Sequence, residues 1–491
     1  MSNSPVNIND ERDVRLHKLE ELQKWGIPAF PAQATKEHSL VLALEAEERL
    51  ILHVAGRIMT KRDMGKLMFC HLQDETARMQ IALKKDDLGE EKYKMFSKLI
   101  DGGDIVQITG EKFTTHKGEP SLLVKEWTLL TKAIRPLPDK FHGISDEELR
   151  LRKRYLDLIM NPELKEMFMR KSRFWNSMRE FLMKEGFLEV ETPVLETTTG
   201  GADATPFVTH HNALDIDVYL RISMGELWQK RLMVGGFEKT FEIGRQFRNE
   251  GMSREHLQDY SQMEFYWAYA DYEKGMDLVQ RMYQHVMKSA FNTLQFTIGE
   301  FGDIDMSGEW PRIDYAETVK EMTGIDLFTA TEKEMFAKLE DLNVKFDPKT
   351  FGRGRIIDLL WKYCRKRIKG PVFLINHPVV VSPLAKRKSD NPELTERYQV
   401  IIAGSELGNG YSELNDPIDQ AGRFEEQGEL RKAGDDEAQM NDMDFVEALE
   451  YGMPPTTGFG VSERLFSFLE NKPIRECVVF PLVRPEIKEE E

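Results

Sequence analysis

The side chains best placed for chemistry lie on two segments, residues 239–247 and 260–270, in which apolar and polar residues alternate. A period of two is typical of strands that bury one face. The alternation predicts a hairpin that presents Arg248, Glu264 and Tyr266 on its polar face. A surface hairpin with its polar face in water has the same pattern, so the alternation alone does not choose between the two interpretations.

The loop between these strands adds Arg254, His256 and Tyr260. An arginine, a histidine and an aromatic ring between antiparallel strands indicate a nucleotide site. In such a site a guanidinium pairs with phosphate and the ring covers adenine.

Three further patterns point to one family. Residues 247–260 resemble motif 2 of the class II aminoacyl-tRNA synthetases, and residues 454–465 resemble motif 3. Residues 187–195 resemble motif 1, whose proline (here Pro193) lies at the dimer interface in that family. One glycine-rich strand-to-helix turn is weak evidence, but three motifs in the class order and at suitable spacing are strong evidence.

Longer stretches are similar to the lysyl-tRNA synthetases within this class: residues 129–143, 154–158, 200–202, 209–215 and 406–416. The resemblance covers nearly the whole chain. It implies a cytoplasmic homodimer that activates L-lysine with ATP, giving lysyl-adenylate and pyrophosphate. Lysine then passes to the 3′-terminal adenosine of tRNA(Lys).

The resemblance also implies an amino-acid pocket. Tyr266 and Glu413 would receive the ε-ammonium, and Arg248 would hold the carboxylate and the α-phosphate. A desolvated carboxylate beside a hydroxyl selects a compact cation, because a neutral isostere would leave the carboxylate unpaired. The implied lysine contacts are Gly201, Glu226, Arg248, Glu264, Tyr266, Asn409 and Glu413.

The implied ATP contacts are Arg248, Asn249, Glu250, His256, Tyr260, Glu406, Leu407 and Arg464, of which Arg248, Glu250 and Arg464 would act in catalysis. Glu406 matches a Mg²⁺ ligand of the family. Gln399 stands where the family usually has a second carboxylate, and a neutral amide holds Mg²⁺ less well. Glu255 replaces the usual loop arginine before the histidine, and we expect Arg254 to take over its phosphate contact.

The N-terminal part has short strand patterns at 51–60, 67–72, 79–83, 105–109 and 121–127, with a helix-like connection at 90–100. This order fits a small OB-fold β-barrel, preceded by a charged helical stretch over residues 10–45. By resemblance, Phe69, Gln80 and Glu119 match anticodon contacts. An aromatic ring on a barrel strand stacks on an unpaired base, although a phenylalanine there is equally typical of the barrel core.

The predicted fold is therefore α+β and multidomain. Residues 1–140 would form the N-terminal helix and OB-fold domain, joined by the proline-containing segment 135–138 to a catalytic domain over 141–491. In the catalytic domain we expect an antiparallel sheet flanked by helices, a helix over 162–185, and strands at 187–190 and 218–222. A helical insertion should cover about 315–370.

The composition agrees with a globular enzyme. No apolar run is long enough to span a membrane, and the three cysteines, Cys70, Cys364 and Cys477, form no metal-binding or disulfide pattern. The net charge of −17 argues weakly against a nucleic-acid partner, but polyanion binding depends on local patches. The basic cluster at residues 150–154 is one such patch.

Two alternatives remain open. An aspartyl- or asparaginyl-tRNA synthetase shares this domain plan, but it would need basic residues for its substrate side chain, whereas Glu226, Tyr266 and Glu413 suit a cation. A paralogue that binds RNA or lysylates a protein without charging tRNA is the second alternative. The OB-like domain argues against a protein-modifying relative, and four intact residues argue against a module that only binds: Arg248, Glu250, Glu406 and Arg464.

Overall fold

The computed structural model describes residues 10–138, 146–202, 204–346, 352–432 and 440–485. The chain divides into two compact units, residues 1–147 and 148–491. The predicted boundary between residues 140 and 141 lies outside the described residues.

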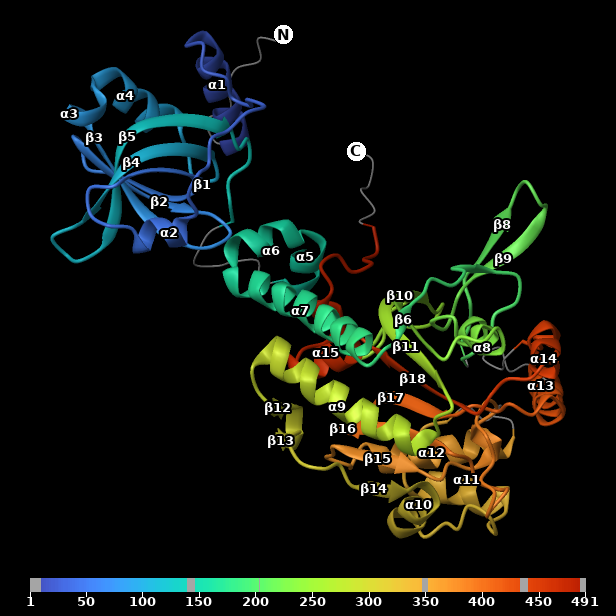
Figure 1. The fold of residues 1–491 in the computed structure, drawn as a ribbon. Coiled ribbons are helices and arrows are strands. Elements are labelled where there is room, and N and C mark those ends of the chain that lie inside the picture. Colours follow the sequence, from blue (N-terminus) through green and yellow to red (C-terminus); the bar gives the residue numbers. More distant parts are fainter. Residues whose placement is uncertain (1–9, 139–145, 203, 347–351, 433–439, 486–491) are drawn as a thin grey trace. The chain divides into compact units, whose positions relative to one another are not determined.

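The first unit is built around a closed five-stranded barrel (Figure 1), in which the neighbour order is β1-β2-β3-β5-β4. Its strands are β1 (Ile51–Asp63), β2 (Leu67–Gln73), β3 (Arg78–Lys84), β4 (Ile105–Thr114) and β5 (Pro120–Thr131). Helices α3 (Lys85–Leu88) and α4 (Glu90–Leu99) connect β3 to β4, as the sequence predicted. Alternate residues of β4 are buried, which is expected where one strand face fills a barrel.

The prediction of a continuous helical stretch over residues 10–45 is wrong in its middle. Only α1 (Glu11–Lys24) and α2 (Leu40–Glu45) are helical. Gly26 follows α1 with φ +69°, a left-handed conformation that ends the helix. Pro28 and Pro31 then prevent it from restarting, because proline lacks the N–H that a helix interior needs.

The second unit contains an eight-stranded sheet of order β14-β15-β16-β17-β18-β11-β10-β6. Its pairs are antiparallel except β14–β15 and β10–β6. The strands are β6 (Leu188–Glu189), β10 (Lys239–Phe247), β11 (Asp259–Ala268), β14 (Arg312–Asp314), β15 (Val372–Ile375), β16 (Arg397–Ile402), β17 (Ser405–Ser412) and β18 (Thr456–Ser462).

One face of this sheet packs against α7 (Pro162–Lys184), α9 (Tyr272–Phe291) and α15 (Arg464–Leu469) in the largest apolar core (Figure 1). Phe265 of β11 lies opposite Phe459 of β18, and Tyr283 of α9 packs edge-on against Phe459 with ring centroids 6.1 Å apart. Because side chains alternate along a strand, the residues between these aromatics point to the other face.

The remaining helices of this unit form further packing groups. Within the predicted insertion, α10 (Tyr315–Thr323), α11 (Glu332–Asp341) and α12 (Arg353–Arg365) share a separate core with β15. Other helices are α5 (Glu147–Arg152), α6 (Arg154–Met160), α8 (Glu226–Val234), α13 (Pro417–Lys432) and α14 (Met443–Glu450). None of the described helices is long and apolar enough to cross a membrane.

Two small sheets complete the unit. One has the order β7-β9-β8 and contains β7 (Leu195–Glu196), β8 (Val208–His211) and β9 (Ile216–Leu220). The other pairs β12 (Gln295–Ile298) with β13 (Gly302–Asp305). The strands predicted at 187–190 and 218–222 are therefore present as β6 and β9, with shifted ends.

Candidate functional site

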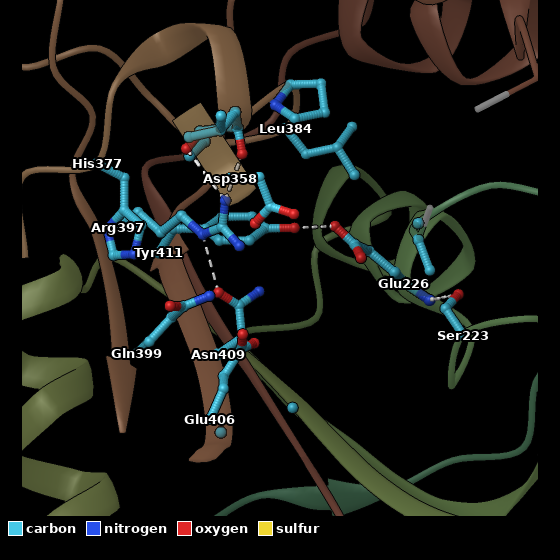
Figure 2. Close-up of a pocket in the computed structure, with 18 of the residues that line it drawn as sticks. Ser223, Glu226, Asp358, His377, Leu384, Arg397, Gln399, Glu406, Asn409 and Tyr411 are labelled. Carbon is cyan, nitrogen blue, oxygen red and sulfur yellow. Dashed lines mark hydrogen bonds between the residues drawn. The ribbon is translucent and has the colours of Figure 1, made fainter. Parts of the chain in front are cut away.

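A cavity of about 990 Å³ lies in the second unit, on the sheet face opposite α9 (Figure 2). Thirteen of the residues predicted from the sequence line it, although they come from six separate segments of the chain. They are Gly201, Glu226, Arg248, His256, Tyr260, Glu264, Tyr266, Gln399, Glu406, Leu407, Asn409, Glu413 and Arg464. Asn249, Glu250 and Arg254 belong to the loop after β10 and are not among the lining residues.

The hairpin formed by β10 and β11 supplies one wall of the cavity. Its register pairs Glu242 with Glu264 and Thr240 with Tyr266, which confirms the predicted polar face. Glu264 and Tyr266 are only 5% and 3% exposed, so this face is not the water-facing surface that the alternation also allowed. Arg248 follows the end of β10 directly.

Strand β18 forms part of the floor, and glycines stand where it faces the cavity. Gly458 lies between Tyr266 of β11 and Tyr411 of β17, and Gly460 lies between Glu264 and Asn409. A Cβ atom at Gly458 would lie 2.2 Å from Glu413 Oε1 and 2.6 Å from Tyr266 Cε1. The glycine-rich pattern of residues 458–460 therefore makes room for the large polar side chains of the neighbouring strands.

One end of the cavity is acidic. Glu264 is buried and accepts hydrogen bonds from the Met224 backbone N–H (2.9 Å), Gln262 Nε2 (2.6 Å) and Tyr266 Oη (3.0 Å). Burial raises the pKa of Glu264 to about 7, with a further contribution from the charge of Glu226. Burial likewise raises the pKa of Glu413 to about 8. Ionisation of these two carboxylates is therefore costly, and a cationic partner would favour it.

A lysine of the chain itself lies between two of these carboxylates. Lys230 of α8 donates a hydrogen bond to Glu226 Oε1 at 2.7 Å, and its Nζ lies 2.6 Å from Glu413 Oε2. The Tyr411 hydroxyl also donates to Glu226, as Figure 2 shows. Neither Lys230 nor Tyr411 was predicted from the sequence as a site residue. The spacing of Glu226 and Lys230, four residues apart on one helix, could have indicated the first contact.

The other end of the cavity is cationic. Arg248 is half-buried, forms no ion pair with any described residue, and lies with its Cζ 5.9 Å from the centre of the Tyr260 ring. Arg464 donates to the backbone oxygen of Glu406, and burial lowers its pKa. Burial and the charge of Arg464 lower the pKa of His256 as well. A guanidinium without a protein carboxylate is suited to bind the phosphate or carboxylate of a ligand.

The loop after β10 places Glu255, and not Arg254, in the cavity. Glu255 Oε2 lies 3.9 Å from Arg464 Nη1 and accepts a hydrogen bond from Ser405 at 2.5 Å. Arg254 is exposed. Its predicted phosphate contact therefore stays a prediction.

The residues predicted to hold a metal offer one carboxylate. Glu406 is half-buried, with Oε2 3.8 Å from Arg365 Nη1, while Gln399 is buried and neutral opposite Asn409. Within the described ranges, no group of three or more histidine, cysteine, aspartate or glutamate side chains could bind a metal. Glu406 fits Mg²⁺, which commonly binds one carboxylate together with substrate phosphates and water.

In the first unit, a hollow of about 480 Å³ brings together Gln80 and Glu119 with His71 and Arg78. Gln80 is buried and donates to Ser121 Oγ at 2.9 Å. Phe69 lies two residues before His71 on β2, hence on the same strand face, and is half-buried outside the barrel core. The interpretation of Phe69 as a core residue is therefore not supported.

Pro193 lies in an exposed segment with large apolar neighbours. Val194 and Leu195 are 42% and 49% exposed, and Pro193 itself is exposed. Adjacent exposed apolar side chains of this kind are typical of a surface that contacts another protein.

The chain was compared with known proteins. Residues 146–484 match the family described as tRNA synthetases class II (D, K and N), and residues 52–130 match the OB-fold nucleic acid binding domain. The chain is 44% identical to the lysine–tRNA ligase of Thermotoga maritima, over 99% of this chain and 98% of that protein. It is 46% identical to the lysine–tRNA ligase of Moorella thermoacetica and 44% identical to that of Bacillus subtilis, each over 97% of this chain and 98% of the relative.

Gly458→Ala should lower the free energy of unfolding of the second unit by about 1–3 kcal/mol, because the added methyl group displaces Glu413 or Tyr266. Urea denaturation followed by fluorescence measures this change. Gly422→Ala in α13 is the matched control. A Cβ there meets no atom within 4 Å, so this variant should be equal to the wild type or up to about 1 kcal/mol more stable. Equal stability of the two variants would contradict the crowding at Gly458.

Proposed function

We propose that this chain, which belongs to the class II tRNA synthetases (D, K and N), is a lysine–tRNA ligase. It activates L-lysine with ATP, giving lysyl-adenylate and pyrophosphate, and then transfers lysine to the 3′-terminal adenosine of tRNA(Lys). The observation that carries the proposal is the polarity of the cavity. Buried Glu264 and Glu413 with Tyr266 lie at one end, and unpaired Arg248 lies with Arg464 at the other.

Activation needs no nucleophile from the protein. The lysine carboxylate attacks the α-phosphorus in line, the bond to the bridging oxygen breaks, and pyrophosphate leaves. Arg248 and Arg464 offset the charge that develops on the phosphate oxygens, so that the chain acts by positioning and electrostatic stabilisation. In the second step a ribose hydroxyl of the tRNA attacks the carbonyl carbon of the adenylate, and AMP leaves.

Glu406 would hold Mg²⁺ together with the ATP phosphates, and the ion would supply further positive charge at the phosphates. Asn249, Glu250, His256, Tyr260 and Leu407 are proposed as the remaining nucleotide contacts. His256 and Tyr260 line the cavity next to Arg248 and Arg464, which supports this part of the assignment.

Selection of lysine follows from the acidic end. The ε-ammonium would meet Glu413 and Tyr266, and the α-ammonium would lie near Gly201, Glu226 and Glu264. The carboxylate of aspartate would instead face buried negative charge, and the amide of asparagine would leave that charge unpaired. Both cases cost roughly several kcal/mol. The relatives named above are lysine–tRNA ligases, which agrees with this selection.

The first unit is proposed to read the anticodon. Phe69 would stack on an unpaired base, and Gln80 and Glu119 would contact base edges beside it. The hollow that joins Gln80 and Glu119 supports this proposal. We further propose a homodimer formed through the exposed segment around Pro193, acting in the cytoplasm, where tRNA is charged.

The experiment that tests the function is amino-acid-dependent ATP–pyrophosphate exchange with all twenty amino acids. Exchange with lysine alone is expected. Exchange with aspartate or asparagine would retain the family and refute the acidic pocket as a lysine site, and no exchange with any amino acid would favour the paralogue that only binds RNA.

Arg248→Ala should reduce lysine-dependent exchange at least about 100-fold, because it removes the unpaired guanidinium at the cationic end. Arg245→Ala is the matched control. This exposed arginine pairs with Asp259 on the same hairpin and does not line the cavity, so exchange should stay close to wild type. Normal exchange by Arg248→Ala would refute the role assigned to Arg248.

Phe69→Ala should raise the KM for tRNA(Lys) in aminoacylation by about tenfold or more, because loss of base stacking costs about 1–3 kcal/mol. Exchange without tRNA should not change. Phe30→Ala, at a 60% exposed phenylalanine of the same unit, serves as the control. A variant at Phe69 that charges tRNA normally would refute the anticodon assignment.

A further inference from the structure

Lys230 is the least expected charged residue in the cavity region. It is 1% exposed, and its Nζ lies 2.7 Å from Glu226 Oε1 and 2.6 Å from Glu413 Oε2. The ring centroids of Tyr411 and Phe445 lie 5.4 Å and 5.9 Å from this Nζ atom. A buried ammonium is costly unless it is paired, and here both partners are residues assigned to the lysine pocket.

The groups that face this ammonium come from every element packed against α8. Glu226 lies on α8 itself, and Glu264 and Tyr266 lie on β11. Tyr411 lies on β17, and Glu413 follows this strand directly. Two other carboxylates are paired with arginines: Glu242 of β10 with Arg221, and Asp442 before α14 with Arg231. Buried Glu196 of β7 accepts a hydrogen bond from Trp228 Nε1 of α8 at 2.8 Å, and burial raises its pKa to about 7. The titratable or charged groups around α8 therefore include Glu196, Arg221, Glu226, Lys230, Arg231, Glu242, Glu264, Tyr266, Tyr411, Glu413 and Asp442.

The charges of the pocket residues can be compared with those of the proposed substrate. Glu226, Glu264 and Glu413 contribute three negative charges when ionised, and Lys230 contributes one positive charge, which leaves a net charge of minus two. L-lysine carries two ammonium groups. With its three carboxylates ionised, the pocket with Lys230 therefore offsets the two ammonium groups of lysine, while the substrate carboxylate is assigned to Arg248. Without Lys230 the pocket would have one negative charge too many.

We propose that Lys230 is a positioning residue that orients Glu226 and Glu413 and favours the ionised form of Glu413, and thereby sets the pH at which the pocket accepts the two ammonium groups of lysine. The inference rests on the proposed function, because it concerns recognition of that substrate. Lys230 engages Glu413 Oε2, while Glu413 Oε1 points toward Gly458 and Tyr266 on the cavity side. One carboxylate oxygen thus binds the internal cation, and the other is available to the substrate.

The ionisation of these carboxylates supports the same reading. Burial and the charges of Glu226 and Glu264 raise the pKa of Glu413 to about 8, and the ammonium of Lys230 acts in the opposite direction. A protonated Glu413 donates a hydrogen bond and cannot pair with an ammonium. Lysine affinity should therefore rise as the pH increases through the pKa values of Glu264 and Glu413, about 7 and about 8. Removal of Lys230 moves this rise to higher pH.

The test is the pH dependence of lysine-dependent exchange by Lys230→Met, which keeps the length of the side chain without its charge. The KM for lysine should increase about tenfold or more at pH 7, corresponding to one pKa unit or more. The increase should shrink toward pH 9, and the KM for ATP should change less than about twofold. A purely structural role would alter both KM values, or stability alone, at every pH.

Lys132→Met is the matched control. Lys132 is equally buried in the first unit, with Nζ 2.7 Å from Asp101 Oδ2 and 2.8 Å from Asp104 Oδ2. Its loss should lower stability and leave the pH profile for lysine unchanged. A folded Lys230→Met enzyme with the wild-type pH profile would overturn the proposal.

A measurement on the wild-type enzyme covers the case in which Lys230→Met does not fold. Calorimetric titration with L-lysine at pH 7.5, in two buffers of different ionisation enthalpy, should show proton release on binding. Release of about two protons per lysine would overturn the proposal, because Glu264 and Glu413 would then both be protonated in spite of Lys230. Failure of the proposed function itself is recognised separately, because wild-type enzyme would then show no lysine-dependent exchange at any pH.

Discussion

Glu226, Glu264 and Glu413 lie at the acidic end of the cavity, where protein atoms have replaced most of the water around them. Carboxylates in such a place repel one another and resist ionisation unless cations or hydrogen-bond donors compensate. The surrounding structure supplies these groups: a backbone N–H and an amide reach Glu264, and Lys230 reaches the other two. Much of the local architecture of α8, β11 and the end of β17 serves to hold this negative charge in place.

The sheet makes this arrangement possible because it separates an apolar face from a polar one. Phe265 and Phe459 face α9 in the core, while Glu264 and Tyr266 face the cavity. Between two strands that carry large polar side chains, β18 has glycine at the positions that face the cavity. The glycines of β18 are therefore needed so that the large side chains of the acidic pocket can pack against this strand.

Regular patterns in the sequence predicted the regular parts of this structure. Period-two alternation predicted the hairpin and its polar face, although not the burial of that face, and short strands with one helical connection predicted the barrel. Irregular segments were less predictable. Residues 25–39 are not helical, and Gly26 with two prolines marks the end of the first helix. In the loop after β10, no alternation of apolar and polar residues and no turn-forming residue type indicates whether Arg254 or Glu255 enters the cavity.

Lys230 shows why part of a site escapes sequence reasoning. A lysine on a helix is normally exposed, and its second partner, Glu413, is far away in the chain. At the cationic end, too, the contacts join residues that are far apart in the chain: Arg365 of the helical insertion lies near Glu406, and Glu255 lies near Arg464. With Gln399 neutral, Arg365 and Arg464 lie near Glu406 and Glu255, and Arg248 adds a positive charge that no described carboxylate pairs. An anionic ligand entering beside Arg248 would compete with Glu255 for Arg464, so that the loop after β10 and the phosphate end of the cavity are electrostatically coupled.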